Sequence, residues 1–244
     1  MKAMLTSDLG ASTKVSGKWV PSVLHRKNGL LDTLAAMWPQ EARVLIISAD
    51  PDEFDRNDSV YACLKEALPM SGLSVSVVEN CDSRNLTVVE EMHNMDVIIL
   101  AGGHVPTQNR FMKQLRLKER LQGYQGIVVG WSAGSMNCAE VVYAGPELEG
   151  EAVDPEYQRW ISGLGITEIN IFPHFQSLRE EYLDGLRLIE DITYQDSMVH
   201  EIIAINDGSY IMIDDGKATL YGEAYCIKNG KQTQICRDGE SISL

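Results

Sequence analysis

The chain has 244 residues, of which 44% are hydrophobic, and a formal net charge of −14. This length suffices for one α/β domain with a large core or for two small domains. The sequence contains no Lys/Arg-rich block. Nucleic acids and anionic membranes both bind basic surfaces, so we expect neither as a partner.

The five cysteines are scattered and form no Cys-x-x-Cys pair. We therefore expect reduced thiols rather than a disulfide framework or a zinc knuckle. No apolar run reaches the roughly 18 residues that span a bilayer, and the N-terminus lacks the apolar region of a secretory signal. We also find no metal-ligand spacing, phosphate loop or dinucleotide fingerprint. These features predict a soluble, cytoplasmic protein without metal or cofactor.

The first half of the chain alternates apolar strands with helical patterns. Residues 1–10 predict a strand ending at Gly10, and residues 11–18 a loop. The expected helices cover residues 30–38, 60–68, 84–95 and 108–121. The expected strands cover residues 43–48, 73–78, 97–100 and the apolar run 127–129. Continuous apolar strands between helices are typical of a doubly wound, mostly parallel sheet.

The second half begins with a Gly- and Glu-rich loop over residues 144–151. A strand is predicted at 169–172, and apolar spacing from Leu178 to Ile192 predicts a helix beginning near Ser177. From about residue 201 to 244 the pattern changes to short strands separated by Asn/Asp-Gly turns, which indicate hairpins. We interpret these as a small antiparallel extension of one domain covering residues 1–244, because no linker composition separates them.

A Gly-x-Ser-x-Gly motif, Gly130-Trp131-Ser132-Ala133-Gly134, follows the apolar run 127–129. This is the pattern of a nucleophile elbow, in which a tight strand-to-helix turn raises a serine hydroxyl above the sheet. The two glycines lack a Cβ and let the backbone approach closely. The amide of Ala133 would then face the oxyanion of an acyl-transfer reaction. Backbone amides of Gly102 and Gly103, which follow the strand 97–100, are candidates to complete this oxyanion hole.

A serine nucleophile needs a base, and the base needs an orienting group. Of the five histidines, His174 follows a strand and Pro173 where the chain leaves the sheet edge at which catalytic groups gather. We prefer it to His104, which follows the 97–100 strand and could line the pocket. The order serine, acid, histidine places the acid between them. The carboxylates that compete for this role are Glu147, Glu149, Glu151 and, more weakly, Asp154.

Together, the Gly-Trp-Ser-Ala-Gly motif, the Gly102-Gly103 turn and the stretch Asn170-Ile171-Phe172-Pro173-His174-Phe175 resemble peptidase E. This is the aspartyl dipeptidase family of serine peptidases, whose fold is related to class I glutamine amidotransferases. The resemblance covers most of the chain. It implies Ser132 as nucleophile, His174 as general base and an acid fifteen residues after the serine, which is Glu147 here. It also implies an oxyanion hole from Gly102, Gly103 and Ala133.

The chain departs from the family in two places. The family has Gly-Gly-Gly-Asn-Thr where this sequence has Ala101-Gly102-Gly103-His104-Val105-Pro106-Thr107, so an imidazole reaches the pocket edge. The segment after Phe175 looks shorter than the family segment in which an arginine selects an N-terminal aspartate. Arg179 is the candidate replacement. His104 and Arg179 are therefore the expected substrate-pocket residues.

The sequence predicts a serine exopeptidase of the peptidase E type, with a Ser132–His174–Glu147 triad, that acts on short peptides, including those with N-terminal aspartate. A small peptide would be the substrate, and the protein would be a monomer or homodimer. Two other hydrolases remain open, a cyanophycinase-like amidase and an α/β-hydrolase esterase. A non-catalytic, amidotransferase-like binding domain is the third alternative, and labelling of Ser132 by a fluorophosphonate would distinguish it.

Overall fold

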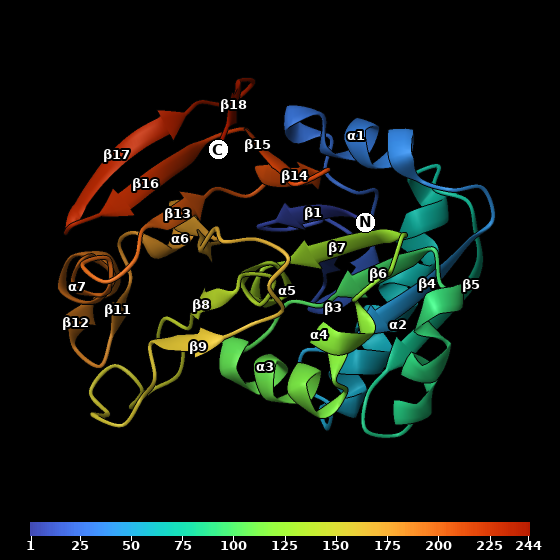
Figure 1. The fold of residues 1–244 in the computed structure, drawn as a ribbon, viewed down its shortest axis with the longest axis horizontal. Coiled ribbons are helices and arrows are strands. Elements are labelled where there is room, and N and C mark those ends of the chain that lie inside the picture. The colour runs from blue at the N-terminus through green and yellow to red at the C-terminus, as the bar shows by residue number, and fades with distance from the viewer.

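The computed structural model describes residues 1–244 and is built around an eight-stranded sheet (Figure 1). Its strands are β1 Lys2–Thr6, β4 Ala42–Ile47, β5 Val75–Cys81, β6 Val97–Leu100, β7 Ile127–Trp131, β14 Tyr210–Asp214, β15 Lys217–Tyr221 and β18 Ser241–Ser243. They lie in the order β18-β15-β14-β1-β7-β6-β4-β5. The neighbouring pairs β1-β7, β7-β6, β6-β4 and β4-β5 are parallel. Strands β14, β15 and β18 add antiparallel pairs at the other end of the sheet.

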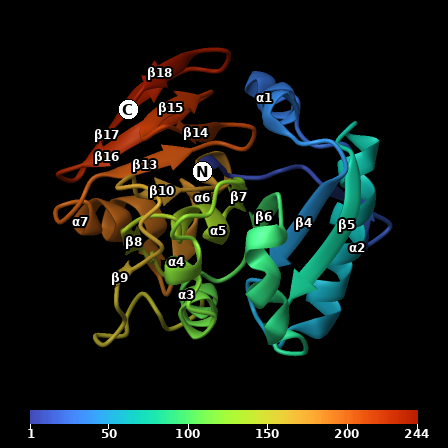
Figure 2. The ribbon, with the colours of Figure 1, turned by 45° about the vertical axis from the view of Figure 1, so that its right-hand side comes forward.

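Helices cover both faces of the parallel region (Figure 2). Their bounds are α1 Leu30–Met37, α2 Phe54–Met70, the 3₁₀ segment η2 Leu86–Asn94, α3 Val105–Gln114 and α4 Leu117–Arg120. Within β6, Val97 and Ile99 pack in the core with α1 and α2, while Ile98 and Leu100 pack with η2 and α3. Alternate side chains of a strand point to opposite faces, so a fully apolar strand is buried on both. The predicted α/β fold is confirmed.

A second sheet of four strands contains β10 Ile171–Phe172, β13 Ile202–Ile205, β16 Ala224–Lys228 and β17 Lys231–Cys236, in the order β10-β13-β16-β17. In Figure 1 its strands β16 and β17 lie at the opposite end of the molecule from α2 and β5. The expected C-terminal extension is therefore divided between the two sheets. Because β13 belongs to the second sheet and β14 to the first, the turn Asn206–Gly208 crosses between sheets instead of closing a hairpin.

Short elements connect the two sheets. They are α5 Ala133–Met136, β8 Val141–Tyr143, β9 Trp160–Ser162, α6 Phe175–Leu178, the π-helical η3 Leu188–Thr193 and α7 Tyr194–Asp196. None of the helices combines the length and apolar character needed to cross a bilayer.

The expected helix 108–121 is interrupted at Arg116, whose φ is 52°, and two further segments form hairpins instead of the expected loop and helix. The expected loop at 11–18 contains β2 Ser12–Val15, which pairs with β3 Lys18–Pro21, and the expected helix after Ser177 contains β11 Tyr182–Leu183 and β12 Leu186–Arg187. Each hairpin turns through two residues with positive φ: Ser16-Gly17 at 48° and 83°, and Asp184-Gly185 at 52° and 81°. Such turns suit right-twisted hairpins. Apolar residues from Leu178 to Ile192 recur at helical spacing, so the sequence favoured a helix over the turn indicated by Asp184-Gly185.

Candidate active site

Ser132 lies at a tight turn between β7 and α5, as the motif predicts. Its backbone has φ 50° and ψ −121°, a conformation that non-glycine residues rarely adopt and that costs on the order of 1–3 kcal/mol. The turn is tied to the end of β1, because the Ser132 amide donates to the carbonyl oxygens of Thr6 at 3.0 Å and Ser7 at 3.1 Å. The Ser135 hydroxyl also donates to the Thr6 carbonyl, at 2.8 Å. These contacts fix a strained serine above the sheet edge.

The flanking glycines are required by packing. A Cβ at Gly130 would meet the backbone of Gly134 and Ser135 at 2.8–2.9 Å, and one at Gly134 would meet the backbone of Leu100. Both contacts are closer than real Cβ atoms tolerate. The glycines therefore permit the close passage of β7, α5 and β6 that raises the serine.

Three backbone amides near Ser132 are free to bind an oxyanion. The amides of Gly102, Gly103 and Ala133 donate to no acceptor within the protein. The residues are close together, since a Cβ on Gly102 would contact the Trp131 indole and lie 3.1 Å from the Ser132 Cβ. Unpaired donors beside a nucleophile fit the negatively charged oxygen of a tetrahedral intermediate. Oxyanion binding by these three residues stays a prediction.

The Gly102–Gly103 loop is supported by Arg56 from α2. The Arg56 guanidinium donates to the carbonyl oxygen of Gly102 at 3.2 Å. Because the carbonyl of Gly102 and the amide of Gly103 belong to one planar trans peptide unit and point in opposite directions, this contact helps to fix the direction of the Gly103 amide. Arg56 is exposed and forms no ion pair.

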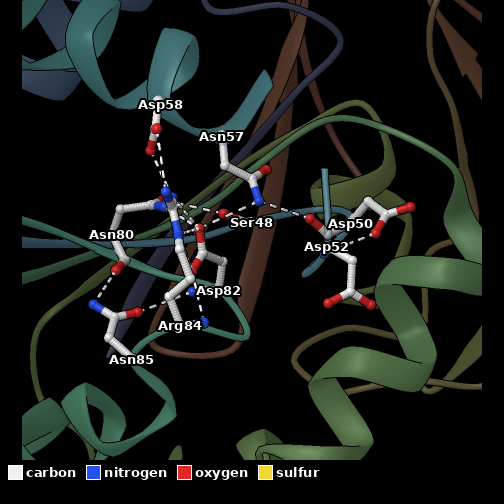
Figure 3. A network of polar contacts seen from close by, with 9 residues as sticks. All are labelled: Ser48, Asp50, Asp52, Asn57, Asp58, Asn80, Asp82, Arg84 and Asn85. Carbon is white, nitrogen blue, oxygen red and sulfur yellow. Dashed lines mark hydrogen bonds and ion pairs between the residues drawn. The ribbon is translucent and has the colours of Figure 1, made fainter. Parts of the chain in front are cut away.

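A polar network at the carboxyl ends of β4 and β5 holds the start of α2 in place (Figure 3). Arg84 bridges Asp82 at 2.6 Å and Asp58 of α2 at 2.5 Å. Asn57 donates to the carbonyl oxygen of Asp50 at 2.8 Å and also contacts Asp82. Burial alone would raise the pKa of Asp82, but its bonds with Arg84 and Asn57 lower it. The network thus positions the residue adjacent to Asn57, which is Arg56.

His174 contacts a carboxylate that the sequence interpretation had not selected. Its Nδ1 lies 2.9 Å from Oδ1 of Asp207. The Ser7 hydroxyl donates to the same carboxylate oxygen and lies 3.2 Å from His174 Nδ1. The other carboxylate oxygen, Oδ2, accepts a hydrogen bond from the side-chain amide nitrogen Nε2 of Gln176. In return, the backbone amide of Asp207 donates to Gln176 Oε1 at 3.0 Å. Asp207 is therefore held from both sides.

These bonds also set the charge of Asp207. Its burial alone would raise the pKa, but the hydrogen bonds from His174, Ser7 and Gln176 outweigh burial and lower the pKa to about 2. The carboxylate is thus ionised at neutral pH. An ionised acid on Nδ1 orients the ring and leaves Nε2 as the nitrogen that exchanges protons.

His174 and Asp207 meet because their strands run in parallel. Strand β10 ends at Phe172 and β13 at Ile205, with Phe172 opposite Ala204. Each functional residue follows two positions after its strand, so both emerge at the same carboxyl edge. The backbone of His174 is unusual, with φ 131° and ψ 43°. Such conformations persist where the surrounding structure imposes them, often at functional sites.

Ser132 and His174 line one cavity of about 490 Å³, together with Glu147 and mostly apolar side chains. No hydrogen bond joins Ser132 Oγ to His174 in this structure. Catalytic hydrogen bonds are often loose without substrate and tighten in the enzyme–substrate complex. The arrangement brings a strained serine and an oriented histidine to one pocket.

Comparison with known proteins agrees with this geometry. The sequence matches peptidase family S51 over residues 25–221, which is most of the chain. The chain belongs to peptidase family S51. A crystal structure of a protein named as a candidate peptidase E from Listeria monocytogenes EGD-e has the same fold, with a TM-score of 0.58 at 13% identity, covering 96% of this chain and 98% of that one. No curated protein matches the sequence. The chain is thus a serine-type peptidase of the peptidase E type.

Within this S51 chain, the prediction that Glu147 orients His174 needs correction. Glu147 Oε1 accepts from the backbone amide of Val105 at 3.2 Å, and Nδ1 of His174 is bonded to Asp207 instead. Glu147 lies in the cavity wall, where protein surrounds its carboxyl although the residue as a whole is exposed. Burial, together with nearby Glu151, outweighs the hydrogen bond from Val105 and raises the pKa of Glu147 to about 7.

The other acidic candidates of the 144–151 loop do not approach His174. Glu151 accepts from the amides of Glu147 and Leu148, at 2.9 and 3.0 Å, and organises the loop. Glu149 is exposed. Asp154 accepts from the backbone amide of Glu156.

The two expected pocket residues lie elsewhere. His104 Nε2 is 2.9 Å from Glu151, and its Nδ1 is 2.8 Å from the Thr107 hydroxyl. His104 joins the Gly102–Gly103 loop to the 144–151 loop and does not line the cavity. Arg179 is 54% exposed beside Glu180 and is also outside the cavity wall. Their expected contact with substrate therefore has no support in the structure.

Proposed function

We propose that this chain hydrolyses a peptide bond of short peptides through an acyl-enzyme on Ser132. The observation that carries the proposal is that His174, bonded to Asp207 and Ser7, lines the same cavity as the strained Ser132. In this proposal His174 is the general base and Asp207 is the acid that orients it. Glu147 has no part in the triad.

The proposed reaction has two steps. Ser132 Oγ attacks the peptide carbonyl carbon and passes its proton to His174 Nε2, while the carbonyl oxygen becomes an oxyanion held by the amides of Gly102, Gly103 and Ala133. His174 then protonates the leaving amine as the C–N bond breaks. In the second step, His174 removes a proton from water, which attacks the ester, and returns that proton to Ser132 as the C–O bond breaks.

Asp207 stabilises the imidazolium that forms in each step. Because its pKa is about 2, Asp207 stays ionised while His174 gains and loses its proton. Ser7 and Gln176 restrain the carboxylate in the plane in which Nδ1 donates. A fixed charge of this kind stabilises a developing positive charge without reorganisation of the site.

Hydrolysis of a dipeptide panel by the wild type and by Ser132→Ala tests the proposal. The wild type should release free amino acids, and Ser132→Ala should lose nearly all of this activity, on the order of 10³-fold or more. Circular dichroism and thermal melting establish that the variant is folded. Equal activity in the two proteins would refute the mechanism.

A further inference from the structure

The cavity beside Ser132 has a mostly apolar wall that no part of the proposed triad uses. Its volume is about 490 Å³, which is sufficient for a single amino-acid side chain and the adjoining backbone. The apolar groups that line it include Met136, Phe172, Leu178, Leu183 and Leu188. Such a surface gains free energy by covering apolar side chains and none by covering charged ones.

The charged groups in this wall are of one sign. Apart from His174, the lining contains the carboxylates Glu147 and Glu181 and no lysine or arginine. Two arginines come near without joining the wall: Arg56, which bonds Gly102, and Arg179, which lies beside Glu180. An aspartate side chain in this cavity would therefore face two carboxylates, with His174 as the one wall residue that can carry a positive charge, while Arg56 acts on Glu147 from outside the wall.

Glu147 is placed to receive a positive group. Its Oε1 accepts one hydrogen bond, from Val105, whereas Oε2 has no partner and no Lys, Arg or His forms an ion pair with the carboxylate. The loop that carries it is fixed by Glu151 through two backbone amides and the adjacent His104. A partly desolvated carboxylate with a free oxygen binds an ammonium group strongly, because the ammonium replaces lost water.

From these observations we propose that the cavity binds the N-terminal residue of a peptide, that Glu147 accepts its α-ammonium group, and that the preferred N-terminal side chain is apolar rather than aspartate. The inference rests on the proposed function. The α-amino group of a peptide has a pKa near 8, so it is largely protonated at pH 7. Besides Glu147, the wall contains six hydrophobic residues, and its other acidic residue, Glu181, is exposed.

The test measures kcat/KM for Leu-Ala, Met-Ala, Lys-Ala and Asp-Ala, and for N-acetyl-Leu-Ala. We expect Leu-Ala and Met-Ala to exceed Asp-Ala and Lys-Ala by about tenfold or more, and acetylation to reduce hydrolysis of Leu-Ala by roughly 30-fold or more, because it removes the charge opposite Glu147. Preference for Asp-Ala or Lys-Ala would overturn the assignment, as would equal hydrolysis of the acetylated peptide.

Glu147→Gln supplies the residue-level test, with Glu149→Gln as the matched control from the same loop. Glu147→Gln should lower kcat/KM for Leu-Ala about tenfold or more and that for N-acetyl-Leu-Ala much less, so that the ratio between the two substrates falls. A ratio is insensitive to partial unfolding, which reduces both rates together. An unchanged ratio would overturn the role of Glu147.

Fluorophosphonate labelling of Ser132 distinguishes the possible failures. If Ser132 is labelled and peptides are cleaved with another preference, the pocket assignment alone fails. If no peptide of the panel is cleaved, the proposed peptidase function and the pocket assignment fail together.

Discussion

Nδ1 of His174 lies 2.9 Å from Oδ1 of Asp207, although the residues are 33 positions apart in the sequence. Their strands β10 and β13 run in parallel and end at the same edge, so each residue emerges two positions after its strand. The contact gives His174 an ionised partner. It also leaves Nε2 as the nitrogen that can serve Ser132.

Replacing Asp207 should disable catalysis without preventing the fold. Asp207→Asn removes the negative charge that orients and stabilises His174, and we expect kcat to fall by about 10³- to 10⁴-fold. Asp215→Asn, in an exposed turn, is the control and should keep wild-type activity. Steady-state kinetics on a cleaved dipeptide measures both. An Asp207→Asn enzyme with nearly normal kcat would contradict the triad.

Ser7 is a positioning residue, since it acts through Asp207. Ser7→Ala removes a hydrogen bond to a charged group, worth roughly 1.5–3 kcal/mol, so kcat should fall about tenfold or more with KM little changed. The control is Ser209→Ala, which removes another buried serine hydroxyl whose bond is to the Glu223 carbonyl. If both variants lose kcat equally, the effect of Ser7 is structural only.

Arg56 should support the oxyanion loop through the Gly102 carbonyl. In Arg56→Met this hydrogen bond is lost and the loop amides are less well fixed. We therefore expect kcat to fall roughly tenfold, which is less than the 10²- to 10³-fold loss on removing an oxyanion donor itself. Arg43→Met, another exposed arginine, serves as control. Steady-state kinetics with one dipeptide measure the effect. A fall in KM with kcat unchanged would argue against this positioning role.

Asp207 should contribute to stability in a defined pH range. Its folded pKa of about 2 lies below the usual aspartate value of 3.8, so the folded state binds protons less tightly than the unfolded state. The contribution is therefore present above about pH 4 and is lost as the pH falls toward 2. Thermal melting of the wild type and Asp207→Asn from pH 6 to pH 2.5 measures it. The wild-type advantage should shrink over the acid part of this range, and a constant difference would disagree with the lowered pKa.

The contribution of Glu147 to folding stability should depend on pH in the opposite direction. Its folded pKa of about 7 lies above the usual glutamate value of 4.5, so the folded state binds a proton more tightly and loses stability as the pH rises from about 4.5 to 7. Solvent reaches part of this residue, which reduces the effect. Glu147→Gln should therefore gain melting temperature relative to the wild type between pH 5 and pH 8. No relative gain would indicate an ordinary pKa for Glu147.

The parts of the site that depend on local patterns could be predicted from the sequence. Ser132 and its flanking glycines form a continuous motif, and His174 directly follows a strand, so both were identified from neighbouring residues. The parallel sheet followed from continuous apolar strands separated by helices. These features require only periodicity and steric limits, which the sequence displays directly.

Asp207 could not be identified in the same way, because its role depends on which strands are neighbours. The turn Asn206–Gly208 has the composition of a hairpin, yet it joins β13 of one sheet to β14 of the other. The available signal was an acid two residues after an apolar strand, at the edge where His174 also emerges. Selecting it required knowing that β10 and β13 pair in parallel, which is a long-range property.

The rate of fluorophosphonate labelling, followed by intact mass and peptide mapping, tests the central claim most directly. The wild type should gain one adduct, on Ser132, and Ser132→Ala should gain none. Asp207→Asn should be labelled far more slowly than the wild type, whereas Glu147→Gln should react at close to the wild-type rate. Labelling at another residue, undiminished labelling of Ser132→Ala, or a slower reaction for Glu147→Gln than for Asp207→Asn would contradict this account.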